Sequence, residues 1–336
     1  MQNDHRQRVP ETSLPRSPRI EYRSVSQNGS IDNALAIVRF GSGPQASADS
    51  LAINVGLDAV GEILPDAIWY GAGPVTSARR GRIRYTHDGE FLFGAIEEHE
   101  ADHADIRAAA AAVYATINEF RRTSSFPHLL RMWNFLDAIN EGDGDAERYR
   151  QFCIGRAEGF GESARNGYPA ATAIGRQQRN GLLQVFWIAG KTPGTAVENP
   201  RQVSAYRYPR AHGPVSPSFS RATIMPDGTL LISGTASIVG HASQHPNDAQ
   251  AQLGETLRNL DALIVHAHQH RASVDANAEL LLTVYIRNPE HADAVIARIR
   301  NDLPQAQAIF MAADICRREL LLEIECVVQR KEVVSG

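Results

Sequence analysis

One stretch organises the fold of this chain, Asp314-Ile-Cys-Arg-Arg-Glu-Leu-Leu-Leu-Glu-Ile-Glu-Cys-Val-Val328. Its second half has an alternating pattern, ends in β-branched residues and contains no glycine or proline, so it predicts a strand. Alternation gives one face, predicted to be core, to Leu320, Leu322, Ile324, Cys326 and Val328. The other face carries Leu321, Glu323, Glu325 and Val327. A glutamate in this setting is either solvated at a sheet edge or held as an acid in a half-apolar site, and the local pattern alone favours the first.

The composition is that of a globular protein. The chain has 336 residues, 43% of them hydrophobic and 21% charged, which is enough for two domains with real cores. A net charge of -4 and the lack of any Lys or Arg run indicate neither a nucleic-acid partner nor a membrane surface. Three cysteines (Cys153, Cys316 and Cys326) are too few for a disulfide framework and indicate a reducing cytoplasm. We also expect no transmembrane helix and no secretory signal.

Hydrophobic periodicity predicts the same series of elements twice. After a strand at 31–40, the first series has a strand at 90–96, a helix at 102–122, a strand at 129–135, a helix at 146–160 and strands at 170–174 and 182–188. The second series has a strand at 229–233, a helix capped by Asn247 or Asp248, a strand at 280–286, a helix from Pro289 to about Asp302, and strands at 306–311 and 320–328. The equal order, offset by roughly 140 residues, argues for two tandem α+β units.

These series divide the chain into four parts. Residues 1–20, with three prolines, are expected to form a flexible tail. Residues 21–190 form the first unit, 191–217 a Pro/Gly-rich connector and 218–330 the second unit. The connector contains Tyr206-Arg-Tyr-Pro-Arg210, which is more aromatic and more basic than a simple linker requires.

Several of these stretches resemble known families. The second unit resembles the RidA/YjgF family through Ile232-Ser-Gly-Thr-Ala-Ser237, the helix at 248–264 and Leu322-Glu-Ile-Glu325. Over roughly residues 30–330 the chain resembles the chorismatases more closely. That resemblance is carried by Leu130-Arg-Met-Trp-Asn-Phe-Leu-Asp-Ala-Ile-Asn-Glu-Gly-Asp-Gly-Asp145, Glu147-Arg-Tyr-Arg-Gln-Phe-Cys-Ile-Gly-Arg156, Tyr206-Arg-Tyr-Pro-Arg210 and the stretch from Asp314 to Glu325.

The resemblance implies an α+β fold of two tandem RidA/YjgF-like units, each a mixed sheet with helices packed on one face. It implies chorismate as substrate, pyruvate as one product, and no metal or organic cofactor. One branch of the family hydrolyses chorismate to a dihydroxycyclohexadiene carboxylate, and another aromatises the ring and releases hydroxybenzoate. Within the second branch the chain resembles bacterial enzymes that form 3-hydroxybenzoate, with some 4-hydroxybenzoate, for pigment and ubiquinone biosynthesis.

The chemistry of chorismate calls for particular side chains. Its two carboxylates require planar positive groups, hence arginines. Cleavage of its enol ether begins with protonation of the terminal methylene, which requires a carboxylic acid with a raised pKa. The resemblance assigns this role to Glu323, which lies between Leu321 and the charge of Glu325. It also matches Cys316, seven residues earlier, to the cysteine of the aromatising branch. The alternative for Cys316 is a small core residue.

Four substrate-binding residues are expected as well, two of them through the resemblance (Tyr149 and Arg156) and two through their place in the chain (Tyr206 and Arg221). Tyr149 and Arg156 are seven residues apart and share one face of a predicted helix. Tyr206 and Arg221 bracket the connector and would meet that helix across a cleft between the units. From local pattern alone, Arg156 would be a surface residue beside a packed tyrosine, and Arg210 competes with Arg221 for the same role.

Other interpretations remain open at this point. A RidA-like imine deaminase would keep an arginine on the penultimate strand, which here contains none between Ala306 and Ala313. A non-catalytic protein that senses an aromatic or keto acid would have the same pocket without turnover. The histidines at 241, 245, 266 and 270 lack the partners of a catalytic zinc site, so no metal site is predicted. We expect a monomer or a small homo-oligomer, because a fused pair could satisfy internally the interfaces that small RidA relatives make as trimers.

Overall fold

A computed structural model of the chain describes residues 16–23, 31–41, 52–61, 66–161, 167–177, 179, 181–270 and 278–331. Residues 1–15 of the predicted tail lie outside this part. Strand β1 (Arg19–Arg23) begins within the last residues of that predicted tail. None of the described helices is both long enough and apolar enough to cross a membrane.

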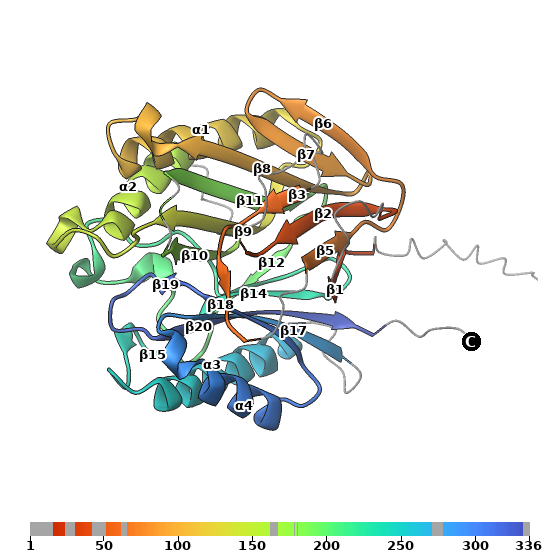
Figure 1. Cartoon of the computed structure of the whole chain (residues 1–336). Helices are drawn as coiled ribbons and strands as arrows, with labels where there is room; N and C mark the ends of the chain where they lie inside the picture. Colours follow the sequence, from red (N-terminus) through yellow and green to blue (C-terminus); the bar gives the residue numbers. More distant parts are fainter. Residues whose placement is uncertain are drawn as a thin grey trace, which may run out of the picture.

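The first unit is built on a seven-stranded sheet with the order β19-β10-β9-β11-β8-β7-β6. These strands are β6 (Thr76–Arg80), β7 (Ile83–His87), β8 (Phe91–His99), β9 (His128–Asp137), β10 (Ala170–Arg176), β11 (Leu182–Gly190) and β19 (Asp314–Ile315). Helices α1 (Ile106–Thr123) and α2 (Arg148–Phe160) cover its outer face (Figure 1). The two helices approach closely because Gly155 has no side chain: a Cβ there would lie 2.1 Å from the carbonyl oxygen of Arg107.

The second unit repeats this plan with the strand order β12-β13-β14-β20-β17-β18-β4. Its strands are β4 (Asp58–Ala59), β12 (Thr195–Val197), β13 (Ala222–Ile224), β14 (Leu230–Thr235), β17 (Ala278–Ile286), β18 (Gln307–Ala312) and β20 (Leu322–Arg330). Helices α3 (Ala249–Gln269) and α4 (Ala292–Asp302) cover its outer face (Figure 1). Asp248 caps α3 by accepting a hydrogen bond from the backbone of Ala251 at 2.9 Å, and Pro289 opens a 3₁₀ turn (Pro289–His291) before α4.

The two sheets match strand for strand. Strand β11 lies between β8 and β9, as β20 lies between β14 and β17. In the first sheet Gln184 is paired with Phe135, and in the second Glu323 is paired with Tyr285. The prediction of two α+β units, each a mixed sheet with helices on one face, is therefore confirmed. The short edge strands cross the predicted boundaries: β19 joins the first sheet, β4 joins the second, and β12 comes from the connector.

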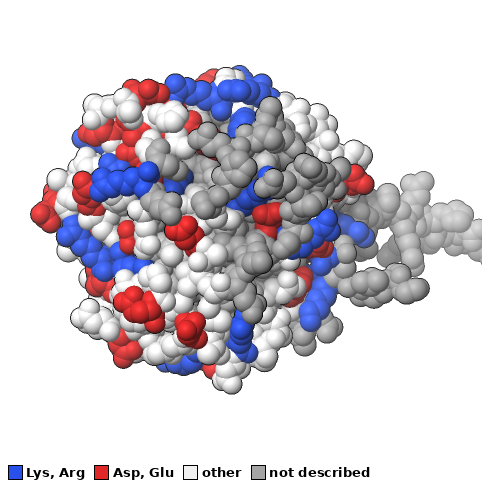
Figure 2. Space-filling view, in the orientation of Figure 1, with Lys and Arg blue, Asp and Glu red and all other residues white. Residues whose placement is uncertain are grey.

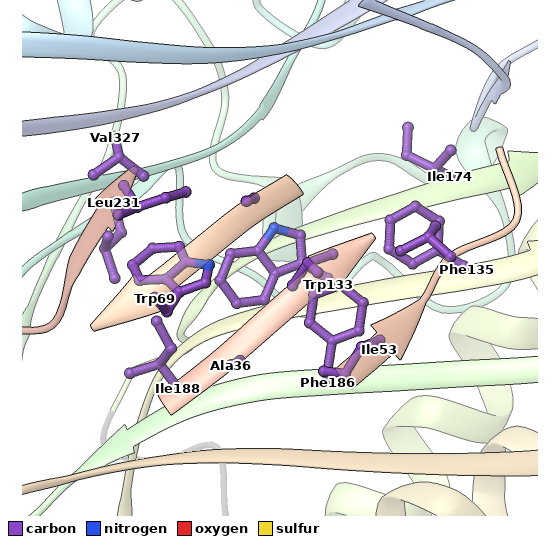
Figure 3. Packing of buried hydrophobic residues seen from close by; sticks show 14 of the residues in the cluster. Ala36, Ile53, Trp69, Trp133, Phe135, Ile174, Phe186, Ile188, Leu231 and Val327 are labelled. Carbon is purple, nitrogen blue, oxygen red and sulfur yellow. The ribbon is translucent and has the colours of Figure 1, made fainter. Parts of the chain in front are cut away.

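The inner faces of the two sheets pack against each other around a shared core. A small sheet with the order β1-β5-β2-β3 fills one end of this space, through β2 (Ala34–Arg39), β3 (Ala52–Asn54) and β5 (Asp66–Tyr70). Trp69 from the small sheet meets Trp133 at 5.7 Å between ring centroids, and Trp133 stacks on Phe186 at 5.1 Å (Figure 3). Burial of such large rings is a main source of stability here.

Strand β20 is central, so both of its faces are covered. Leu322, Ile324, Cys326 and Val328 pack under the helices of the second unit, as predicted. The other face meets the first sheet, and Glu323 and Glu325 are only 4% and 7% exposed. The interpretation of these glutamates as solvated edge residues is therefore wrong, because a sheet distant in sequence covers them.

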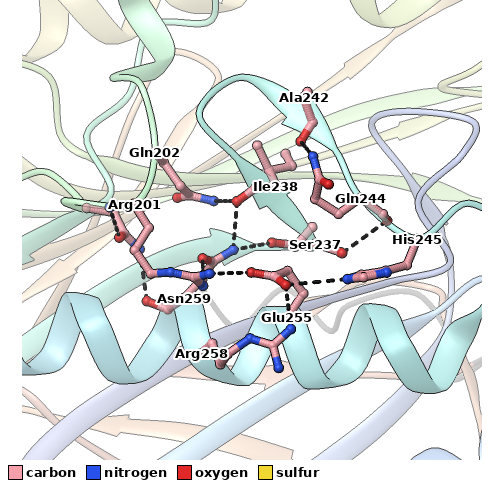
Figure 4. Close-up of polar contacts among 12 residues, drawn as sticks. Arg201, Gln202, Ser237, Ile238, Ala242, Gln244, His245, Glu255, Arg258 and Asn259 are labelled. Atoms are coloured by element: carbon pink, nitrogen blue, oxygen red, sulfur yellow. Dashed lines mark hydrogen bonds and ion pairs between the residues drawn. The ribbon is translucent and has the colours of Figure 1, made fainter.

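The connector is fastened to α3 by a polar cluster (Figure 4). Arg201 donates to Glu255 at 2.5 Å and to Asn259 at 2.6 Å, and Asn259 donates in turn to the carbonyl of Ile238 at 2.9 Å. Burial would raise the pKa of Glu255, but hydrogen bonds from Arg258, Arg201 and His245 lower it to about 2. These hydrogen bonds hold the connector in a defined position on the second unit. Elsewhere, acidic and basic side chains are interspersed on the face shown in Figure 2.

Candidate active site

A pocket of about 330 Å³ opens between the two units. Its walls come from α2, β10, the connector, the turn after β14 and the segment between β19 and β20. These elements lie at the end of the molecule away from the small sheet (Figure 1). Two units distant in sequence thus form one cavity, which is a common setting for a ligand site.

Five of the six predicted site residues line this pocket: Tyr149, Arg156, Arg221, Cys316 and Glu323. The sixth, Tyr206, is not among the lining residues. It is 36% exposed and its ring packs on Tyr168, with 5.4 Å between centroids. Tyr208 lines the pocket in its place. The structure therefore places Tyr206, next to the 3₁₀ turn Ala205–Arg207, outside the pocket and Tyr208 in its wall.

Glu323 lies at the centre of the pocket wall on β20. Burial, followed by the negative charge of Glu325, raises its pKa to about 8, against the opposing charges of Arg131, Arg221 and Arg317. The carboxyl group packs on the backbone of Gly234, where a Cβ would approach Glu323 Oε1 to 1.8 Å. Glu323 is therefore a protonated acid at neutral pH, held against a glycine and facing the cavity.

Three arginines present unsatisfied donors at this pocket. Arg156 from α2 is 3% exposed, lies over the rings of Tyr114 and Phe160 at 5.1 and 5.5 Å, and has no partner for its Nε among the described residues. The same holds for Nε of Arg221 and Nη2 of Arg317. A buried guanidinium without an anion is costly, so this arrangement indicates a site shaped for an anionic ligand.

Arg221 and Arg317 are oriented by their other contacts. Arg221 donates to Tyr208 Oη at 2.6 Å and to the carbonyl of Val203 at 2.9 Å, which ties it to the connector. Arg317 donates to the carbonyl of His241 at 2.9 Å and to Ser243 at 3.0 Å, and its guanidinium lies 5.1 Å from the ring centroid of Tyr208. The rival candidate Arg210 pairs instead with Asp145 and does not line the pocket.

Three further residues line the pocket that were not predicted from the sequence: Tyr208, His212 and Arg317. His212 lines the pocket and contacts His241 at 3.0 Å between ring nitrogens, while burial and then the charge of Arg317 lower its pKa to about 4. Two features of the sequence could have indicated two of these residues. Tyr208 lies within the aromatic and basic connector motif, and Arg317 directly follows Cys316 in the stretch that leads into β20.

Tyr149 and Cys316 complete the wall beside Glu323. The Tyr149 ring stacks on Phe152 with 6.4 Å between centroids. Burial, and then the charge of Glu323, raise the pKa of the Cys316 thiol, so the thiol stays protonated at neutral pH. Cys316 also packs against two of the apolar clusters, so it both supports the core and faces the cavity. Among the described residues, His, Cys, Asp and Glu side chains form no group of three that could hold a metal ion.

Comparisons with known proteins agree with this site. The family described as "Chorismatase FkbO/Hyg5-like, N-terminal" matches residues 67–189. The chain is 36% identical over 280 residues to a 3-hydroxybenzoate synthase of Streptomyces hygroscopicus, covering 78% of this chain and 80% of that protein. It is 34% identical over 273 residues to a chorismatase of the same organism, with 78% of each covered.

A solved structure extends the likeness to the fold. The crystal structure of a chorismatase superposes with a TM-score of 0.81 at 27% identity, covering 94% of this chain and 99% of that one. The alignment thus includes both units and the pocket between them. The chain is a member of the chorismatase family of enzymes.

Proposed function

We propose that this enzyme converts chorismate to 3-hydroxybenzoate, with some 4-hydroxybenzoate, and pyruvate, without a metal or organic cofactor. The observation that carries the proposal is the protonated Glu323 in a pocket with three arginines whose donors are unused. The named activity of the similar 3-hydroxybenzoate synthase supports it.

The arginines bind and orient the substrate. Chorismate is a dianion, and Arg156, Arg221 and Arg317 offer it charged, planar donors from both sides of the pocket. Because Arg156 and Arg221 are buried, Arg317 is half-buried, and each has a nitrogen without a partner among the described residues, the carboxylates would supply partners that are missing. Binding energy of this kind holds the enol ether against the acid.

Glu323 then starts the reaction. Its carboxyl group gives a proton to the terminal methylene of the enol ether, and the carboxylate that remains offsets the oxocarbenium ion that forms. Addition of water at the cationic carbon and collapse of the hemiketal release pyruvate and leave a ring diol. Loss of water from that diol gives hydroxybenzoate. The water taken up is returned, so chorismate equals hydroxybenzoate plus pyruvate.

The alternative is that the reaction stops at the diol, the dihydroxycyclohexadiene carboxylate. Cys316 favours the aromatic outcome, because it lies on the pocket wall beside Glu323 and resembles the cysteine of the aromatising branch. The ring hydroxyl that leaves decides between the 3- and 4-hydroxy products.

The test uses purified protein and chorismate. Pyruvate release should be observed, and chromatography should identify 3-hydroxybenzoate as the main aromatic product. The variant Glu323→Gln should release no pyruvate while its circular dichroism spectrum stays that of the wild type. Undiminished turnover in that variant would contradict the mechanism, and a diol as the sole ring product would favour the hydrolytic alternative.

A further inference from the structure

A second carboxyl group is enclosed behind the pocket wall. Glu325 lies two residues from Glu323 on the same face of β20, but it is not among the residues that line the pocket. Its Oε1 accepts a hydrogen bond from Tyr285 Oη at 2.7 Å. Its Oε2 accepts from Trp133 Nε1 at 2.9 Å, from Thr172 Oγ1 at 2.8 Å and from Arg131. Four donors, and no acceptor among the described residues, surround the Glu325 carboxyl group, an arrangement that suits a negative charge.

The counter-ion is equally enclosed. Arg131 is 2% exposed, its guanidinium lies 4.8 Å from the ring centroid of Trp133, and its Nη1 has no partner among the described residues. A buried ion pair of this kind contributes little net stability compared with apolar residues of the same volume. Stability alone is therefore a poor explanation for a charge pair at the centre of this core.

Glu325 is linked to Glu323 by a short chain of contacts. Thr172 donates to Glu325, and the same hydroxyl oxygen accepts the backbone N–H of Gly234 at 3.0 Å. The Glu323 carboxyl group packs on Gly234: if this glycine had a Cβ, that atom would lie only 1.8 Å from Glu323 Oε1. The orientation of Thr172, set by Glu325, thus fixes the surface on which Glu323 lies.

The second link is electrostatic. Within the described part of the chain, the titratable or charged groups near Glu323 include Glu325 from its own strand, Arg131 from β9, Tyr285 from β17, Tyr149 from α2, Arg221 before β13, and Cys316 and Arg317 after β19. Glu325 is the negative charge among them and opposes ionisation of Glu323. The positive charge of Arg131 is paired with Glu325. The positive charges of Arg221 and Arg317 line the pocket, where a dianionic substrate would neutralise them.

We propose that Glu325 is a positioning residue for the reaction: as an enclosed anion it keeps the Glu323 carboxyl protonated and, through Thr172 and Gly234, holds it against the pocket wall. This rests on the proposed role of Glu323 as the acid. Arg131 is part of this arrangement, because it pairs with the charge of Glu325 and does not itself line the pocket.

The decisive measurement is made on the free protein. Infrared difference spectra between each protein and its Glu323→Gln counterpart report the carbonyl stretch of the protonated Glu323 as the pH is raised. In Glu325→Gln we expect the midpoint to fall by about one pH unit or more. Tyr285→Phe is the matched control, since it removes one hydrogen bond from Glu325 but no charge, and its midpoint should stay near that of the wild type.

The same shift should appear in catalysis. The alkaline limb of kcat/KM for pyruvate release should move to lower pH in Glu325→Gln by as much as the infrared midpoint. Thr172→Val tests the geometric link: it keeps both charges, so kcat should fall while the midpoint stays. A folded Glu325→Gln protein with the wild-type midpoint overturns the proposal.

Two further measurements distinguish a failure of this proposal from a folding defect and from a failure of the proposed function. If Glu325→Gln does not fold, the pair Arg131→Met with Glu325→Leu removes both charges at similar volume, and its midpoint should fall by a smaller amount. A wild-type protein that releases no pyruvate contradicts the proposed function, whereas the infrared midpoint still tests Glu325 itself.

Discussion

The carboxyl group of Glu323 rests on the backbone of Gly234: a Cβ at that glycine would lie 1.8 Å from Oε1 and 2.7 Å from the carboxyl carbon. Gly234→Ala should therefore displace the acid without unfolding the protein, because the clashing atoms belong to the end of a side chain. We expect pyruvate release to slow by about tenfold or more. Gly254→Ala is the matched control in α3, where the nearest atom is 3.6 Å away. It should keep full activity and gain about 0.5–1 kcal/mol of stability. Equal rates in the two variants would contradict the role of this contact.

Glu323 should reduce stability as the pH rises. Its pKa is about 8 in the folded protein, against 4.5 for an ordinary exposed glutamate, so between these values the unfolded chain has lost a proton that the folded protein keeps. Stability must then decrease with pH across this window. Glu323→Gln removes the effect, and we expect it to be more stable than the wild type by about 3 kcal/mol at pH 7 and by little at pH 4. Urea denaturation at the two pH values checks this, and a difference that does not depend on pH would refute it.

Arg156 should be needed for affinity and dispensable for folding. Its guanidinium has no anion partner among the described residues, so Arg156→Met should leave the urea midpoint unchanged or raise it. Loss of a charge-assisted contact to a carboxylate should raise KM for chorismate by roughly 30- to 100-fold. Arg210→Met is the matched control, since this exposed arginine pairs with Asp145 outside the pocket. A KM that rises equally in both variants would count against a specific role for Arg156.

Two tyrosines in the connector provide a matched pair. Tyr208 Oη accepts a hydrogen bond from Arg221 at 2.6 Å, so Tyr208→Phe leaves that arginine less well oriented. We expect KM to rise roughly tenfold, from a lost hydrogen bond to a charged group. Tyr206→Phe should match the wild type, because Tyr206 lies outside the pocket. Steady-state kinetics on the two variants decide the point, and the reverse order of effects would restore the sequence-based prediction.

Cys316 should control the fate of the ring more than the release of pyruvate. Its thiol faces the pocket but stays protonated at neutral pH, so it does not replace Glu323 as the acid. We expect Cys316→Ala to keep pyruvate release within about tenfold of the wild type while the proportion of hydroxybenzoate falls and that of the diol rises. Chromatography of the ring products gives the ratio. An unchanged ratio would assign Cys316 to packing alone.

Much of the fold could be predicted because local sequence patterns indicate most of its helices and strands. The alternation along β20, the aliphatic stripe of α1 and the Asp248 cap are all properties of neighbouring residues. Each is found, although α1 begins at Ile106 and not at Asp102, and β20 spans Leu322–Arg330 and not 320–328. The two-residue strands β4 and β19 were not predictable, since they carry no periodic pattern and exist only through pairing with distant strands.

The site was predictable to the extent that it depended on motifs. Glu323 and Arg156 were found through family likeness, whereas their local patterns favoured exposed positions. Arg131 and Glu325 contact each other across 194 residues, so no local pattern could join them. The choice between Tyr206 and Tyr208 depended on the direction of a single 3₁₀ turn, which composition does not encode.

The matching registers of the two sheets show how the two units differ at one equivalent position. Gln184 occupies in the first sheet the position that Glu323 occupies in the second, each opposite an aromatic residue. Its side-chain amide donates to the carbonyl of Asn54 at 3.0 Å, and Arg176 beside it donates to the carbonyl of Val55 at 2.8 Å. In the first unit, backbone carbonyls of Asn54 and Val55 therefore contact the side chains at this position. The first unit thus uses the amide of Gln184 to hold its own backbone, whereas the second presents the carboxyl group of Glu323 to the pocket, so that only the acid-bearing position is available for catalysis.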